Sequence, residues 1–190
     1  MNDNIKNNAY LDRNYVRLTD FDYSLPGAYF VTICSHNKQC IFDDIERGEM
    51  HLNSFGKIAQ KCWGDLPLHY DGVVNDIFIM MPNHVHGILI IPSDNGRSGS
   101  HISLEAEYLR KPDPTKKYPL HEIVRAFKTY SSRNINELRH SPGTVVWQRS
   151  FYEHVIRSDK EYRKIGEYIT YNVAKWDIDT ENPNINTINQ

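Results

Sequence analysis

Residues 73–91, VVNDIFIMMPNHVHGILII, contain two apolar runs separated by Pro82 and Asn83. Such a break between two strand-like runs is typical of a β-hairpin, so we predict antiparallel strands over residues 73–81 and 84–91. Successive side chains of a strand point to opposite faces, which places His84 and His86 on one face and Val85 on the other. The second strand therefore directs two imidazoles toward one point.

The flanking sequence predicts an α+β domain around this hairpin. Apolar residues recur there at strand or helix spacing, and Ser158 followed by Glu161 is a capping-box signature for a last helix. We expect strands over residues 28–35 and 145–156, and helices over residues 53–66, 120–141 and 158–176. This order is that of a ferredoxin-like split βαβ sandwich, in which we expect an antiparallel sheet with helices on one face.

The composition is that of a folded protein without a strong charge bias. The chain has 190 residues, and 22 Lys and Arg against 24 Asp and Glu give a net charge of −2. The overall charge therefore does not indicate a nucleic-acid partner. Three cysteines without a CxxC pair favour reduced thiols. The apolar run over residues 77–91 is interrupted by polar residues, and the first residues lack a secretory pattern. We therefore expect a cytoplasmic protein without a membrane span.

Two segments depart from the pattern of a packed domain. Residues 92–118 gather Pro, Gly, Ser and charged residues, which is typical of a long surface connection. The Asn-rich end of the chain has the composition of a frayed terminus. We expect an N-terminal extension over residues 1–22, one domain over residues 23–176 with a flexible connection at 92–118, and a frayed tail over residues 177–190.

The histidine pair is the first candidate for chemistry. Two imidazoles on one strand face can bind a metal ion, although partly exposed histidines without a ligand explain the same pattern. On the helix predicted from residue 120, Tyr130 and Asn134 are four residues apart and share the edge of the apolar stripe. An amide at that margin needs a polar partner, and a metal ion on His84 and His86 would provide one.

These residue types suit cleavage of a phosphodiester by a tyrosine. A divalent ion on two imidazoles and an amide keeps open positions for a phosphate oxygen, and the Tyr130 phenol would attack phosphorus to form a phosphotyrosine. Phosphate chemistry favours Mg²⁺ or Mn²⁺ as the ion. Position alone does not distinguish Tyr130 from other tyrosines, and four remain equal candidates: Tyr152, Tyr162, Tyr168 and Tyr171.

Basic side chains are concentrated in the second half of the chain. Residues 120–164 hold nine basic and five acidic side chains, a net charge of +4 that leaves −6 for the rest. Arg149 and Arg157 mix with the aromatic residues Trp147, Phe151 and Tyr152, as cations and aromatics do on surfaces that bind single-stranded nucleic acid. A solvated helix face beside core aromatics is an equally good explanation.

Several stretches carry a family resemblance. Residues 81–87, MPNHVHG, followed by ILII, resemble the HUH motif (His, hydrophobic, His) of the single-stranded-DNA tyrosine transposases of bacterial insertion sequences. Further stretches are similar to the REP-associated tyrosine transposases, a domesticated branch of that group: 23–34 (YSLPGAYFVTIC), 123–130 (IVRAFKTY), 133–136 (RNIN) and 146–157 (VWQRSFYEHVIR). The resemblance spans about residues 13–176.

The resemblance implies a fold, a site and a substrate. It implies the HUH nuclease fold, Mg²⁺ or Mn²⁺ on His84 and His86, Tyr130 as nucleophile and Asn134 as third ligand. It also implies that a monomer, with a homodimer as the alternative, binds, cleaves and rejoins single-stranded DNA beside palindromic hairpins. His154 matches a recurrent family position and is a candidate for supporting the metal ligands. Candidate DNA contacts, from the resemblance and from the charge pattern, are Arg13, Arg17, Arg125, Lys128, Arg133, Arg149 and Arg157.

One departure and two alternatives accompany this interpretation. Relatives often have Asn-Pro where this chain has Asn172-Val173, so the last helix is expected to continue. One alternative is a domesticated protein that binds hairpin DNA without turnover. The other is a structural zinc site on Cys34, His36 and Cys40 with a further ligand, although this spacing matches no common zinc motif.

Overall fold

The structure is a computed structural model that describes residues 21–92, 118–179 and 181–183. Nearly all of the expected N-terminal extension and of the connection 92–118, and most of the tail, therefore lie outside the described residues. The strands are β1 (Gly27–Cys34), β2 (Asp43–Glu46), β3 (Glu49–Leu52), β4 (Val74–Met80), β5 (His84–Ile91) and β6 (Tyr152–Ile156). The helices are α1 (Ser54–Gly64), α2 (Leu66–His69), α3 (Leu120–Leu138) and α4 (Asp159–Thr170), with 3-10 turns η2 (His36–Lys38) and η4 (Val173–Ile178).

The main sheet has the order β4-β5-β1-β6, and each neighbouring pair is antiparallel. β1 therefore runs parallel to β4, and β5 runs parallel to β6. α1 lies on the connection from β1 to β4, and α3 lies on the connection from β5 to β6. This is the ferredoxin-like arrangement that the order of predicted elements indicated, so the α+β fold class is confirmed.

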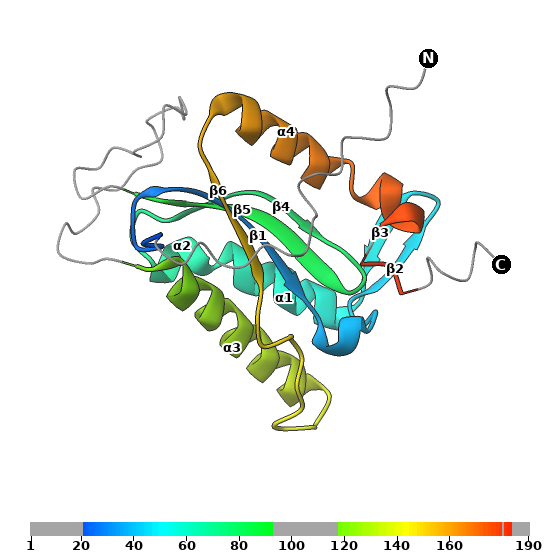
Figure 1. Cartoon of the computed structure of the whole chain (residues 1–190). Coiled ribbons are helices and arrows are strands. Elements are labelled where there is room, and N and C mark those ends of the chain that lie inside the picture. Colours follow the sequence, from blue (N-terminus) through cyan, green and yellow to red (C-terminus); the bar gives the residue numbers. More distant parts are fainter. Residues whose placement is uncertain (1–20, 93–117, 180, 184–190) are drawn as a thin grey trace, which may run out of the picture.

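The helices cover both faces of the sheet (Figure 1). On one face, Tyr29, Val31 and Val85 pack with apolar residues of α1 and α3. On the other face, Phe30 and Ile88 pack with apolar residues of α4. The sheet is thus the central layer of three.

The expectation of helices on one face is wrong for α4. Parallel strands in one sheet are joined by crossovers of a single hand, and this rule brings α1 and α3 to the same face. α4 follows the last strand and returns to no strand of the main sheet, so the rule does not apply to it. It covers the otherwise exposed apolar face that includes Ala28, Phe30 and Ile90.

The small hairpin of β2 and β3 was not predicted. Its strands are short and largely polar, so they lack the alternating apolar pattern of a half-buried strand. The turn between them places Arg47 and Gly48 at φ 53° and 80°. Two consecutive residues with positive φ are typical of a type I′ hairpin turn.

The last predicted strand and helix differ from the prediction at their ends. β6 begins at Tyr152, and from the expected stretch 145–151 only an isolated bridge between Trp147 and Ser35 joins the sheet. α4 ends at Thr170 and passes into the 3-10 turn η4, so the α-helix does not continue past Asn172. None of the described helices is long and apolar enough to cross a membrane.

The described part of the tail is packed, contrary to the expectation of fraying. Asp179 and Asn182 are buried, and the Asn182 amide donates a hydrogen bond to the Trp176 carbonyl. The Asn83 side chain donates to the Glu181 carbonyl at 2.7 Å. These contacts hold the chain end against the beginning of β5.

Candidate active site

His84 and His86 lie side by side on the face of β5 that α4 covers. Their side chains are 0% and 1% exposed, and their Nε2 atoms are 2.9 Å apart. Two nitrogen ligands about 2.1 Å from one ion and at right angles to each other are about 3 Å apart. The spacing of the two Nε2 atoms therefore fits two ligands of one metal ion.

The other ring nitrogens of the pair are held by polar side chains. His84 Nδ1 lies 2.8 Å from the Asn83 Oδ1 oxygen, and the Asn83 amide nitrogen donates to the Lys38 and Glu181 carbonyls. Because Oδ1 can only accept, His84 Nδ1 carries the proton and Nε2 presents its lone pair. His86 Nδ1 lies 2.8 Å from the Thr32 hydroxyl. Partners of this kind fix the orientation of metal-binding histidines.

Burial keeps His86 uncharged. The imidazole is removed from water, and this desolvation lowers the pKa of His86 to about 3. A neutral imidazole is the form that binds metal ions.

Tyr168 is the tyrosine that the structure brings to the histidine pair. It lies on α4, and its hydroxyl oxygen is 3.2 Å from His86 Nε2. The ring contacts those of His86 and Phe30 with centroid distances of 5.1 and 6.1 Å. These contacts direct the phenol toward the point that both imidazoles face.

The other tyrosines that the sequence left as candidates lie differently. Tyr162 donates its hydroxyl to the Asp76 carboxylate, and burial together with this hydrogen bond raises the pKa of Tyr162. Tyr171 is mostly exposed. Tyr152 lines a cavity beside Thr32.

Two more side chains, both in the segment that follows Tyr168, have the chemistry of metal ligands. A carboxylate oxygen of Asp179 and one ring nitrogen of each histidine lie within 4.8 Å of one another. Asn172 is buried one helical turn beyond Tyr168, and its Oδ1 atom accepts no hydrogen bond from any described residue. A buried amide oxygen without a donor is costly, and a metal ion would satisfy it. Two imidazoles with a carboxylate or amide oxygen suit Mn²⁺, and also Mg²⁺, so the residues present fit a divalent ion.

Tyr130 and Asn134 are not part of this cluster. Both lie on α3, which packs on the sheet face that Val85 joins, whereas the histidines point to the opposite face. Tyr130 is 54% exposed and stacks on the His69 ring at 6.0 Å. The prediction that these two side chains join the histidines is therefore wrong, because the sheet separates them.

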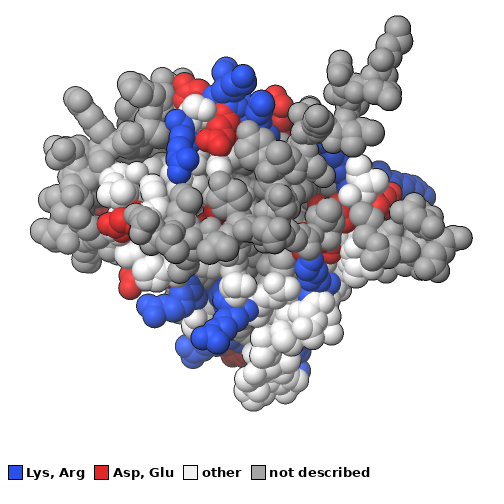
Figure 2. Space-filling view, viewed as in Figure 1, with Lys and Arg blue, Asp and Glu red and all other residues white. Residues whose placement is uncertain are grey.

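In the view of Figure 2, Lys and Arg side chains lie toward both the top and the bottom of the molecule. The predicted cations come from different elements. Arg125 and Arg133 are exposed on α3, away from the histidine pair, and Arg157 is exposed just before α4. Lys128 donates to the carbonyls of residues 148, 149 and 150 at 2.9, 3.2 and 2.9 Å, so it anchors a loop. Arg13 and Arg17 lie outside the described residues.

Arg149 and His154 lie on the side of the sheet that carries the pair. Arg149 lines a cavity that includes Thr32, the partner of His86. His154 is hydrogen-bonded to Glu161 at the start of α4, with 2.7 Å between Nε2 and Oε1. His154 thus connects β6 to the helix that carries Tyr168.

The alternative zinc site does not form. Within the described residues, the one cluster of three potential metal-binding side chains is that of His84, His86 and Asp179. Cys34, His36 and Cys40 do not form such a cluster.

The sequence contained signals for the residues that were missed. Tyr168 and Asn172 have the same four-residue spacing as Tyr130 and Asn134. Spacing alone could not separate the two pairs, because it does not reveal which helix covers the histidine face. Asp179 was missed because it follows the last apolar stripe of the sequence and so falls in the segment predicted to fray.

The four-stranded ferredoxin-like sheet, with His84 and His86 on a central strand, is a fold that the chain shares with a solved transposase structure. The chain aligns with a solved structure, "Structure of the REP associates tyrosine transposase bound to a REP hairpin", with a TM-score of 0.55 and 16% identity over 85% of this chain and 72% of that one. No family model matches the chain.

Two curated proteins of Haemophilus influenzae extend the relationship to sequence. One, named "Uncharacterized protein", is 38% identical over 171 residues, which cover 88% of this chain and 91% of that protein. The other, "Putative REP-associated tyrosine transposase", is 27% identical over 155 residues, which cover 81% and 74%. The chain belongs to one family with the first protein and is a relative of the REP-associated tyrosine transposases.

Proposed function

We propose that this protein is a metal-dependent, transposase-like nuclease that cleaves and rejoins single-stranded DNA through Tyr168. The observation that carries the proposal is the contact between the Tyr168 hydroxyl and His86, within a buried cluster that also holds His84. Relatives named as transposases support the enzyme class. The structural neighbour is bound to a REP hairpin, which supports DNA with palindromic hairpins as the substrate of this chain.

Four side chains would hold the ion. They are His84, His86, Asn172 and Asp179, of which Asn172 supplies an otherwise unsatisfied oxygen and Asp179 a negative charge. When bound, Mg²⁺ or Mn²⁺ would withdraw charge from the phosphate oxygens. These four residues replace the ligand set of His84, His86 and Asn134 that the sequence predicted.

Tyr168 supplies the nucleophile. Its phenol loses a proton, its oxygen forms a bond to phosphorus, and the bond from phosphorus to the leaving strand breaks. The leaving oxygen takes up a proton and becomes a DNA hydroxyl. One phosphate ester replaces another, so attack by a DNA hydroxyl on the phosphotyrosine reverses the step and rejoins strands.

The contacts of α4 support a tyrosine that acts within its own chain. Tyr162 is hydrogen-bonded to Asp76 of β4, and Glu161 is paired with His154 of β6. These contacts hold the first half of α4 on the sheet of the same chain. We therefore favour a monomer in which Tyr168 serves its own histidine pair.

Denaturing electrophoresis tests the proposal. Labelled single-stranded oligonucleotides from palindromic repeats flanking the gene are incubated with wild-type protein in Mn²⁺ or EDTA. A slower band that forms in Mn²⁺ and is lost in EDTA and in Tyr168→Phe is expected. Hairpin binding without a covalent band would instead favour the alternative of a hairpin-binding protein without turnover.

A further inference from the structure

A cavity of about 840 Å³ opens beside the histidine pair. Thr32 lies in its wall and also contacts His86 Nδ1 at 2.8 Å, so the cavity and the cluster share a side chain. Other parts of the wall come from η2, from the loop before β6, and from the packed chain end. The proposed reaction uses none of these other residues.

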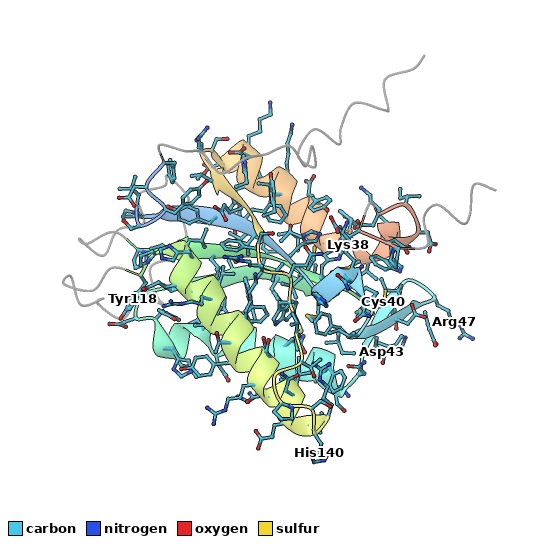
Figure 3. All side chains as sticks on the ribbon, turned by 60° about the horizontal axis from the view of Figure 1, so that its bottom comes forward. Lys38, Cys40, Asp43, Arg47, Tyr118 and His140 are labelled. Atoms are coloured by element: carbon cyan, nitrogen blue, oxygen red, sulfur yellow. The ribbon has the colours of Figure 1, made fainter. Side chains whose placement is uncertain are left out.

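Two cations of the cavity wall come from different segments. Lys38 belongs to η2 and lies beside the chain end (Figure 3), where its Nζ atom is 2.7 Å from a Glu181 carboxylate oxygen. Arg149 is exposed on the loop before β6. Lys128 of α3 donates hydrogen bonds to three carbonyls of this loop. These bonds hold the backbone at Arg149 in place.

An aromatic side chain lies in the same wall. Tyr152 is the first residue of β6 and faces the same side of the sheet as Thr32, its cross-strand neighbour. Its ring packs edge-on against Phe30 at 6.0 Å, and the residue remains partly exposed to the cavity. Aromatic rings combined with cations are the usual means of holding single-stranded nucleic acid.

We propose that this cavity is a subsite for a nucleotide next to the phosphate that Tyr168 attacks. The base stacks on Tyr152, and a backbone phosphate lies between Lys38 and Arg149. The inference rests on the proposed function, because it assumes a DNA strand that enters the histidine cluster. It assigns to the cavity a single-stranded stretch of the DNA outside the hairpin.

The ion pair between Glu181 and Lys38 makes the subsite sensitive to the charge of both residues. The Glu181 carboxylate is bound to the Lys38 ammonium, so an incoming phosphate competes with this carboxylate for the cation. Removing the Glu181 charge should strengthen binding of the single strand, whereas removing the Lys38 charge should weaken it. If the ion pair served only to stabilise the structure, removing either charge would weaken binding of the single strand.

The test compares two fluorescent DNA probes, a palindromic hairpin alone and the same hairpin with eight-nucleotide single strands on both sides. Their affinities are measured in EDTA with Tyr168→Phe as the parent protein, so that no cleavage occurs. We expect the flanks to raise affinity, and Arg149→Ala and Tyr152→Leu each to reduce this gain about fivefold or more. The plot of log affinity against log salt concentration has a negative slope, and Arg149→Ala should make this slope less steep by about 0.7.

Two further variants complete the test. Glu181→Gln is expected to increase the gain from the flanks, and Lys57→Ala, which removes an exposed cation from α1, is expected to leave it unchanged. 2-Aminopurine placed along the flank should show one quenched position that recovers in Tyr152→Leu. Equal affinity for both probes, or a gain that these cavity variants do not change, would overturn the subsite. The covalent band formed by wild-type protein is scored separately, so its absence would overturn the proposed function instead.

Discussion

The Tyr168 hydroxyl oxygen lies 3.2 Å from Nε2 of His86, although 82 positions separate the two residues in the chain. The contact requires α4 to pack on the face of β5 to which both histidines point. It brings a phenol to a pair of buried imidazoles. A tyrosine nucleophile and a metal ion would meet in this arrangement.

Metal binding should depend on Asn172 and not on Asn134. Asn172→Ala removes a buried, unsatisfied oxygen one helical turn beyond Tyr168, and we expect the affinity for Mn²⁺ to fall about tenfold or more. Asn134→Ala changes an exposed side chain on α3 and serves as the matched control. Electron paramagnetic resonance of free Mn²⁺ during a titration measures both affinities. Weakening by Asn134→Ala alone would contradict the ligand set.

The nucleophile should act in cis. A mixture of Tyr168→Phe and His86→Ala contains one intact histidine pair and one intact tyrosine, on different chains. Because α4 is held on its own sheet, we expect no covalent adduct from the mixture and a light-scattering mass near 22.2 kDa. Restored adduct formation would show that chains exchange their tyrosines.

The free energy of unfolding should depend on pH through Lys128, which holds the loop that carries Arg149. Burial lowers the pKa of Lys128 to about 8 from an ordinary value of 10.5. Between these values the unfolded chain binds more protons than the folded chain, so this group adds to the free energy of unfolding as pH rises through that window. Below about pH 8 both states are protonated and the contribution is constant.

Urea unfolding of wild-type protein and Lys128→Met at about pH 7.5 and about pH 9.5 checks this linkage. Other titrating groups are common to both proteins and cancel in the difference. The stability of wild type relative to the variant should increase at the higher pH. A difference that stays constant or decreases would show that Lys128 keeps its ordinary pKa.

Gly87 should be needed for close packing beside His86. A Cβ atom at this position would lie 2.4 Å from Cζ2 of Trp63 on α1, so Gly87→Ala forces the ring or the strand to move. We expect a loss of about 1–3 kcal/mol in the free energy of unfolding. Gly64→Ala is the control, because its Cβ would meet no described atom within 4 Å, and we expect a gain of up to about 1 kcal/mol. Equal effects of the two substitutions in urea unfolding would contradict this packing argument.

Local patterns were sufficient to predict much of the fold. The break at Pro82 and Asn83 predicted the hairpin of β4 and β5, and helical spacing predicted α1, α3 and the start of α4. Alternation along β5 predicted that His84 and His86 share a face. All of these inferences depend on residues that are close together in the sequence.

The tyrosine and the third ligand could not be chosen in this way. Tyr130 with Asn134 and Tyr168 with Asn172 have the same spacing on amphipathic helices, and only the packing of each helix on one face of the sheet separates them. The packing of Asp179 depends on the chain end reaching back to Asn83. Such long-range contacts leave no periodic signal in the sequence.

The identity of the residue that becomes linked to DNA tests the account most directly. Protein incubated with hairpin-bearing single-stranded DNA and Mn²⁺ is digested with nuclease and protease, and the modified peptide is sequenced by mass spectrometry, with Tyr130→Phe as a parallel sample. We predict a nucleotide on Tyr168 in both proteins. A nucleotide on Tyr130, lost in Tyr130→Phe, would contradict the central claim.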